Sequence, residues 1–220
     1  MKKIIIVFCL WCLSSCSVAN EQSTLTCYAD DDVWQSLDDS KTNLLINWLD
    51  RFFLTDKKNT IGFACVDKEI LYASVFGSRL ETGVYAIKLK APNEALNKIA
   101  YGTYLLDTLS DANQRNYLLL KQTSLNKGVG ELSYVAVGLY QEYPQTVLFK
   151  GQYDGESAGC GRATTLPLTK ALLKHNYTLK SINGASSIVI QAGFMDCASK
   201  QVTQEEFEFS ATTSGLVQQK

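Results

Sequence analysis

The residues of this 220-residue chain that are best suited to do chemistry lie between positions 155 and 175. Gly155-Glu156-Ser157-Ala158-Gly159 has the G-x-S-x-G spacing that places a serine nucleophile on a sharp turn between a strand and a helix. Cys160 follows this motif directly, and His175 is the single histidine of the chain. A serine or cysteine activated by a histidine would make the protein a hydrolase with a covalent intermediate.

The residues around this motif do not supply the rest of that machinery. A nucleophile of this kind needs a strand that leads directly into the serine and a helix that follows it at once. The apolar run before Ser157 ends at Phe149, and Gly161 and Pro167 make a poor start for a helix. No acidic residue lies between Ser157 and His175. We therefore expect no catalytic residues, and a Ser or Cys hydrolase is the alternative function.

The first nineteen residues have the pattern of an export signal. Lys2 and Lys3 precede an apolar run over residues 4–13, which is about half the length that a membrane-spanning helix needs. Leu13-Ser14-Ser15-Cys16 resembles the lipobox of bacterial lipoproteins, in which the cysteine becomes the lipidated first residue. This resemblance covers only the signal and implies cleavage after residue 15 and an outer-membrane lipoprotein that faces the periplasm. Ser17-Val18-Ala19 offers the alternative of cleavage after residue 19, which would give a soluble periplasmic protein.

The cysteines fit an oxidising compartment. Of seven in the chain, four lie in the region expected to be mature and not lipidated: Cys27, Cys65, Cys160 and Cys197. An even number in an exported protein predicts two disulfides, with three possible connectivities. Similar spacings favour Cys27–Cys65 and Cys160–Cys197, as does a short similarity between residues 62–65 and 193–197. No two of these four cysteines form a C-x-x-C pair and the chain has one histidine, so we expect no metal site.

Composition excludes several classes of partner. The hydrophobic fraction of 46% and charged fraction of 20% are typical of a globular protein. The formal net charge of −1 becomes more negative once the lysines of the signal are removed, and no basic run is present. We therefore expect no nucleic acid as a partner. No motif for a cofactor is found, and none is expected.

Periodicity predicts an α+β protein that is mainly α. After a tether over residues 16–29, apolar residues recur at helical spacing, which predicts antiparallel short helices over residues 30–143. The expected helices cover residues 30–54 (as one helix or two, capped by Asp30 or Ser40), 60–76, 96–109, 111–121 and 129–143. Residues 80–91 fit a helix or a strand.

The region over residues 144–211 is expected to contain both α and β structure. Residues 146–149, 188–190 and 206–209 have the β-branched or alternating pattern of strands. Residues 167–176 could form a short helix, with His175 partly exposed at its C-terminal end. Residues 212–220 are polar, which predicts a flexible tail.

The expected function is protein binding in the bacterial cell envelope, because the chain offers no catalytic set, metal cluster or cofactor loop. Within that class we expect an immunity or inhibitor protein against an envelope-acting toxin; an accessory subunit of an envelope assembly or secretion machine is the alternative. The expected partners are a periplasmic protein and, through the lipid anchor, the membrane. Tyrosines near the junction of the two regions are the candidate binding residues. They are Tyr140, Tyr143 and Tyr153.

Lipidation at Cys16 is the first testable prediction. Protein extracted from membranes should have Cys16 as its first residue and the added mass of two or three acyl chains, because more than one chain is needed for durable anchoring. Intact mass spectrometry measures this directly. An unmodified protein whose N-terminal sequence begins at Asn20 would contradict the lipobox.

Overall fold

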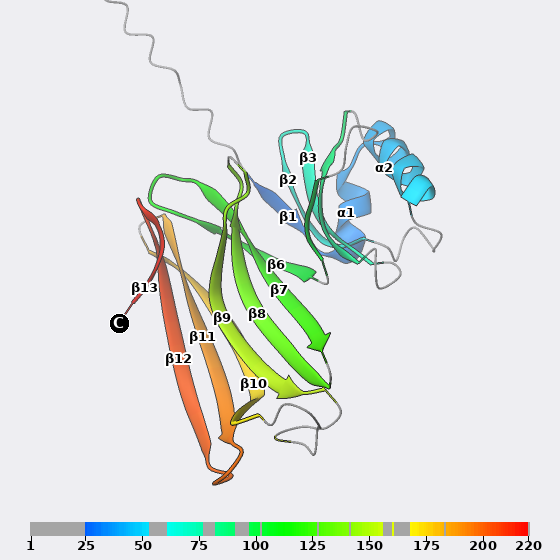
Figure 1. Cartoon of the computed structure of the whole chain (residues 1–220). Helices are drawn as coiled ribbons and strands as arrows, with labels where there is room; N and C mark the ends of the chain where they lie inside the picture. Colours follow the sequence, from blue (N-terminus) through cyan, green and yellow to red (C-terminus); the bar gives the residue numbers. More distant parts are fainter. Residues whose placement is uncertain are drawn as a thin grey trace, which may run out of the picture.

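A computed structural model describes residues 25–52, 61–76, 82–90, 97–101, 103–126, 128–140, 142–155, 160, 168–182 and 184–219. These residues form two helices and thirteen strands, arranged as three antiparallel sheets (Figure 1). The helices are α1 (Asp30–Ser36) and α2 (Asp39–Phe52). Sheet A contains β1 (Thr26–Tyr28), β2 (Ile61–Asp67), β3 (Ile70–Val75), β4 (Gly83–Lys88) and β5 (Asn97–Tyr101). Sheet B contains β6 (Thr103–Ser110), β7 (Asn116–Asn126), β8 (Val129–Gly138) and β9 (Gln145–Asp154). Sheet C contains β10 (Lys170–Ile182), β11 (Ala185–Asp196), β12 (Val202–Thr212) and β13 (Gly215–Gln218).

The prediction of a mainly α protein is wrong. Among the described residues, only those of α1 and α2 form α-helices, and the expected helices from residue 60 onward are replaced by strands. The prediction of helices within residues 30–54 is right, but the capping residues differ from those predicted. Ala29 precedes α1 without a side-chain cap, and the Asp38 carboxylate accepts a 2.9 Å hydrogen bond from the backbone N–H of Lys41 at the start of α2.

Each sheet is a simple meander in which neighbours in sequence are neighbours in space. Several connections are tight turns: Asp67 pairs with Ile70, and Asn126 pairs with Val129. Residues with positive φ make these turns possible, and at Lys68 (φ 54°) and Gln114 (φ 61°) the residue is not glycine. The meander explains why every neighbouring pair of strands is antiparallel.

Sheet B forms the middle of the molecule because it buries apolar residues on both of its faces. Alternate residues of β7 point to opposite faces: Leu118 and Leu120 pack against sheet A, and Leu119 packs against sheet C. On β8, Val135 faces sheet A and Ala136 faces sheet C in the same way. The other face of sheet A carries the helices, whose buried side chains include Val33, Leu45 and Leu49, and Leu37 in the link between them is buried there too. The order of layers is therefore helices, sheet A, sheet B and sheet C (Figure 1).

Burial on both faces explains the incorrect helices. A strand covered on one side alternates between apolar and polar residues, whereas one covered on both sides has a continuous apolar run. The run Tyr117-Leu118-Leu119-Leu120 is fully buried, and β3 is buried at every position from Leu71 to Val75. Such runs satisfy helical spacing by chance, and they are rich in Leu and Ala, which also favour helices. The three predicted strands, which contain more β-branched or alternating residues, lie within β9, β11 and β12.

Two disulfides join the pairs that the spacing favours. Cys27 on β1 lies opposite Cys65 on β2, with 4.0 Å between the Cα atoms. Cys160 bonds to Cys197, which follows β11, with 5.3 Å between the Cα atoms. Each closes a loop of nearly forty residues, for which the chain-entropy model gives about 3 to 4 kcal/mol of stabilisation. The first holds the three-residue β1 to sheet A, and the second holds residue 160 to sheet C.

The C-terminal segment that was expected to be a flexible tail contains a strand, β13. β13 pairs with β12 through Phe209↔Gln218, Ser210↔Val217 and two further pairs. Gly215 adopts a φ of +118° at the turn, a conformation that glycine allows. Four residues of the predicted flexible tail therefore form the edge of sheet C.

Two leucines on β7 test the central position of sheet B. Leu119→Ala should lower the free energy of unfolding by about 2–5 kcal/mol, because Leu119 is fully buried and its removal leaves a cavity. Leu125→Ala, a matched control on the same strand where the side chain is 68% exposed, should change it by less than about 0.5 kcal/mol. Urea unfolding followed by circular dichroism measures both. Equal effects would contradict the described burial of sheet B.

Candidate functional site

The residues of the alternative hydrolase hypothesis do not form a thiol-based site. Cys160 is bonded to Cys197, so its sulfur is not available as a nucleophile. Ser157 lies outside the described residues. His175 is described, and its surroundings differ from those expected at a helix terminus.

His175 lies on β10 and faces the interior between sheets B and C. Its neighbours on the same face of β10 are Leu172 and Tyr177, and all three point toward sheet B. The Nδ1 atom of His175 lies 2.7 Å from the hydroxyl oxygen of Tyr134 on β8. The rings of His175 and Tyr177 both meet the ring of Tyr134 edge-on, at centroid distances of 5.6 and 5.8 Å. Tyr134 is thus the centre of a small polar and aromatic cluster.

Burial and a nearby cation control protonation in this cluster. Loss of solvent lowers the pKa of His175, and the positive charge of Lys121 lowers it further. Burial also raises the pKa of Tyr134 to about 12, with a smaller contribution from Tyr177. At neutral pH the histidine is therefore neutral and the tyrosine keeps its proton, which gives a neutral hydrogen bond between them.

Lys121 stands in a row of aromatic residues that crosses sheet B. The register places Tyr104 on β6 opposite Lys121 on β7, Lys121 opposite Tyr134 on β8, and Tyr134 opposite Phe149 on β9. Because residues directly opposite each other share a face, all four side chains belong to the face that meets sheet C. Lys121 is half-buried, and no carboxylate partner for it is found in the described part of the chain.

A pocket of about 480 Å³ opens beside Lys121, at the β6 edge of sheet B. Its walls are aromatic and aliphatic side chains with three polar groups among them: Phe63, Ser74, Phe76, Tyr104, Leu105, Leu106, Lys121 and Thr123. The Phe76 and Tyr104 rings lie 5.6 Å apart. Gly62 leaves room for Phe76, since a Cβ at that position would lie 2.5 Å from the ring. The Ser74 hydroxyl accepts a 2.7 Å hydrogen bond from the Leu105 N–H and so fixes sheet A against sheet B at this point.

The three candidate tyrosines do not form one surface. Tyr140 is 38% exposed in the connection between β8 and β9. Tyr143 in the same connection packs against the core between sheets A and B. Burial raises the pKa of Tyr72 there, and Tyr143 raises it further. Tyr153 lies near the other end of β9 and covers Gly130. The length of β9 therefore separates Tyr153 from Tyr140 and Tyr143 by about 25–30 Å.

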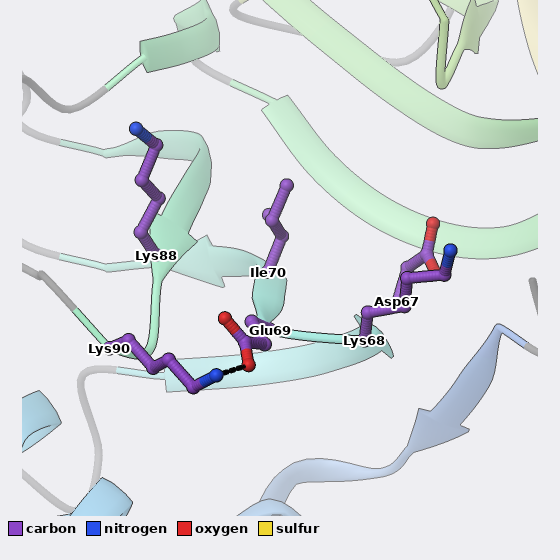
Figure 2. Close-up of a pocket in the computed structure, with 6 residues that line it drawn as sticks. All are labelled: Asp67, Lys68, Glu69, Ile70, Lys88 and Lys90. Carbon is purple, nitrogen blue, oxygen red and sulfur yellow. Dashed lines mark ion pairs between the residues drawn. The ribbon is translucent and has the colours of Figure 1, made fainter.

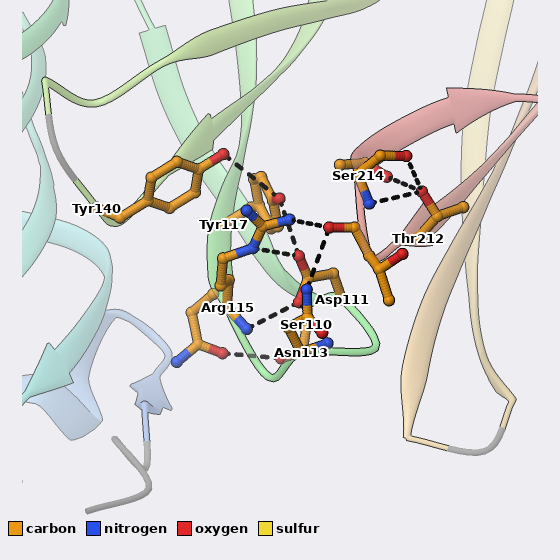
Figure 3. A network of polar contacts seen from close by, with 11 residues as sticks. Ser110, Asp111, Asn113, Arg115, Tyr117, Tyr140, Thr212 and Ser214 are labelled. Carbon is orange, nitrogen blue, oxygen red and sulfur yellow. Dashed lines mark hydrogen bonds and ion pairs between the residues drawn. The ribbon is translucent and has the colours of Figure 1, made fainter. Parts of the chain in front are cut away.

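Tyr140 belongs to a polar network that ties three turns together (Figure 3). Asp111 is fully buried, and its carboxylate accepts hydrogen bonds from the backbone N–H groups of Asn113 and Arg115 and from the Arg115 side chain at 2.6 Å. Tyr117 donates to the same carboxylate at 3.2 Å. Arg115 also donates to the Thr213 carbonyl at 2.9 Å, and its guanidinium lies 5.3 Å from the Tyr140 ring centre. The carboxylate is thus well satisfied, and Arg115 and Tyr140 are held in place at the surface.

A second pocket, of about 450 Å³, lies beside the turn between β2 and β3 (Figure 2). Its lining is largely charged: Asp67, Lys68, Glu69, Ile70, Lys88 and Lys90. Lys90 forms an ion pair with Glu69, which offsets charge within this pocket. The pocket beside Lys121 is the stronger candidate for a binding site because its cation is not offset in this way and its walls are aromatic.

Among the described residues, no group of three or more His, Cys, Asp or Glu side chains could hold a metal ion. None of the helices described above has the length and apolar character needed to cross a membrane.

Comparison with known proteins assigns no family. No protein-family model matches the chain, and no curated protein matches it. Among solved structures, the crystal structure of endo-arabinase from Bacteroides thetaiotaomicron VPI-5482 is similar at 12% identity with a TM-score of 0.34. The match covers 71% of this chain and 58% of the endo-arabinase chain, so this chain spans less than two thirds of that protein. A TM-score of this size supports no conclusion about fold or function.

The sequence identified only part of this site. His175 was recognised as a residue suited to chemistry, but its partner Tyr134 and the nearby Lys121 were not. Lys121 ends a run of buried apolar residues on β7, and a charge that interrupts such a run is the signal that could have identified it.

The lowered pKa of His175 predicts how stability depends on pH. In the unfolded chain the imidazole should titrate near 6.5, above its folded value, so the unfolded state binds more protons between the two values. Stability from the neutral histidine is therefore present above pH 6.5 and lost as pH falls toward the folded pKa. Between pH 7.5 and 5, His175→Gln should lose less stability than the native protein in urea unfolding. Parallel curves for the two proteins would contradict the shift.

Proposed function

We propose that this chain is an exported bacterial envelope protein, lipid-anchored through Cys16, that acts by binding another protein in the periplasm. The two disulfides support export, because such bonds persist in oxidising compartments. The signal-like N-terminus supports the same placement.

The pair formed by Arg115 and Tyr140 is the observation that carries the binding proposal. Tyr and Arg are the residue types that dominate binding energy at protein interfaces. Tyr140 is 38% exposed, and its hydroxyl lies 3.5 Å from that of Tyr117. Arg115 is fixed by the buried Asp111, so little side-chain freedom remains to be lost when a partner binds. A preorganised Tyr–Arg pair on exposed turns is suited to anchor a protein partner.

An immunity or inhibitor protein that occludes an envelope-acting toxin is the sharpest form of this proposal. Such a protein needs a rigid surface and an anchor near the site of damage, and it needs no chemistry of its own. An accessory subunit of an envelope assembly or secretion machine would use the same surface in a different complex. Identification of the captured partner distinguishes these two forms.

Substitution of Tyr140 tests the binding surface. Tyr140→Ala should weaken capture of the periplasmic partner by tenfold or more, because truncation of a central anchor costs about 2 kcal/mol or more. Val202→Ala is a suitable control, since Val202 is 56% exposed and lies at the end of β12 farthest from the β12–β13 turn. Quantitative pull-down with the mature protein gives both affinities. Unchanged capture by a folded Tyr140→Ala protein would remove this surface from the proposal.

Catalysis is tested separately with the purified mature protein. Hydrolysis of a generic ester and of cell-wall fragments should be absent, and Ser157→Ala and His175→Ala should each leave the biological effect intact. Turnover that disappears with Ser157→Ala would replace the binding proposal with the hydrolase alternative.

A further inference from the structure

We propose that the pocket beside Lys121 binds a small monoanion: a carboxylate carried on an aromatic or short alkyl group. This site is separate from the Arg115–Tyr140 surface and does not depend on the proposed function. Tyr117, which contacts Tyr140, and Lys121 lie on the same face of β7 with the fully buried Leu119 between them.

The walls of the pocket fit the apolar part of such a ligand. Rings from both sheets face it: Phe63 and Phe76 come from the sheet A side and Tyr104 comes from β6. Leu105 and Leu106 complete the apolar lining. A volume of about 480 Å³ is within the range of pockets that enclose small molecules. The ring pair of Phe76 and Tyr104 offers two faces against which a flat or alkyl group can pack.

The polar groups of the pocket fit the carboxylate. Lys121 supplies an ammonium group, and the Thr123 hydroxyl, two residues along the same face of β7, can donate a hydrogen bond. The Ser74 hydroxyl accepts from the Leu105 N–H, which does not use its own O–H, so Ser74 is a second possible donor. Lys121 also lowers the pKa of His175, after burial itself, which indicates that its charge acts on groups inside the protein.

Charge balance selects a monoanion among the possible ligands. Lys121 is the one cationic side chain among the described residues that line the pocket. A dianionic phosphate would be neutralised only in part, and a cationic ligand would be repelled. A neutral ligand would leave the ammonium group half-buried without a partner. A single carboxylate offsets the charge and leaves the apolar group for the rings.

Binding to the mature native protein is the first test, and His175 provides the signal. As the single histidine it gives one set of imidazole resonances by NMR. The probe is 3-phenylpropionate, which should bind with a dissociation constant of about 1 mM, as expected for a ligand of this size. The carboxylate of the bound probe would offset the charge of Lys121, so binding should also raise the pKa of His175 toward 6.5. Acetate, which lacks the apolar group, and 3-phenylpropanamide, which lacks the charge, should each bind at least about tenfold more weakly.

Two lysine substitutions locate the charge that is responsible. Lys121→Met keeps the apolar stem and removes the ammonium group, so it should weaken binding of 3-phenylpropionate about tenfold and leave binding of the amide unchanged. Lys180→Met is the matched control, because Lys180 is an exposed residue of β10 and does not line the pocket. It should leave both affinities unchanged.

The ligand series on native protein keeps the proposal falsifiable even if the variants fold poorly. Equal affinity for the acid and the amide would overturn the role of charge, and equal affinity for the acid and acetate would overturn the role of the apolar walls. Absence of saturable binding at about ten times the expected dissociation constant would overturn the site as a whole. Unchanged binding of the acid to a folded Lys121→Met protein would place the carboxylate elsewhere.

Discussion

Burial of sheet B on both faces is the constraint on which the rest of the structure depends. Its central strands carry apolar residues on both sides, so neither face can be left to water without a large loss of hydrophobic stabilisation. Sheet A covers one face and sheet C the other, and the helices are then needed to cover the outer face of sheet A. The Leu105 N–H bonded to Ser74, and the Ser110 N–H bonded to Ser186 at 2.9 Å, fix β6 to both covering sheets.

The same constraint decides how much of the fold the sequence could predict. The helices near residues 30–52 were recognisable because α2 has one apolar stripe and one polar face, and the disulfide pairs followed from spacing. The strands of sheets A and B were not, because their alternation is lost when both faces are apolar. Turns at Lys68 and Gln114 also lack the glycine signal that marks a hairpin. One hairpin does have a local signal: the sequence Asn183-Gly184 separates the paired residues Ile182 and Ala185, and Asn-Gly is typical of a two-residue hairpin.

The candidate site could be predicted only in its single titratable residue. His175 stands out as the one histidine, but its environment is made by Tyr134 and Lys121, which are 41 and 54 positions away in sequence. Residues that are distant in sequence meet here because sheet C folds back over sheet B, and no local pattern encodes that contact. His175 is partly exposed as expected, but it lies on a strand and not at a helix terminus, and burial lowers its pKa.

Packing in the fold does not by itself explain why position 121 holds a lysine. The positions before it on the same face of β7 are Tyr117 and Leu119, both buried, and an apolar residue at 121 would continue that core. A lysine at the rim of a core can extend its stem over apolar surface and place its ammonium group in water. That account explains why Lys121 is tolerated, but not why the rings of Phe63, Phe76 and Tyr104 leave a pocket beside it. Departures from the local rule that serve a site are expected where ligands bind. A cation that is not offset, next to an open aromatic pocket, is such a departure, and a ligand that brings the opposite charge accounts for both features together.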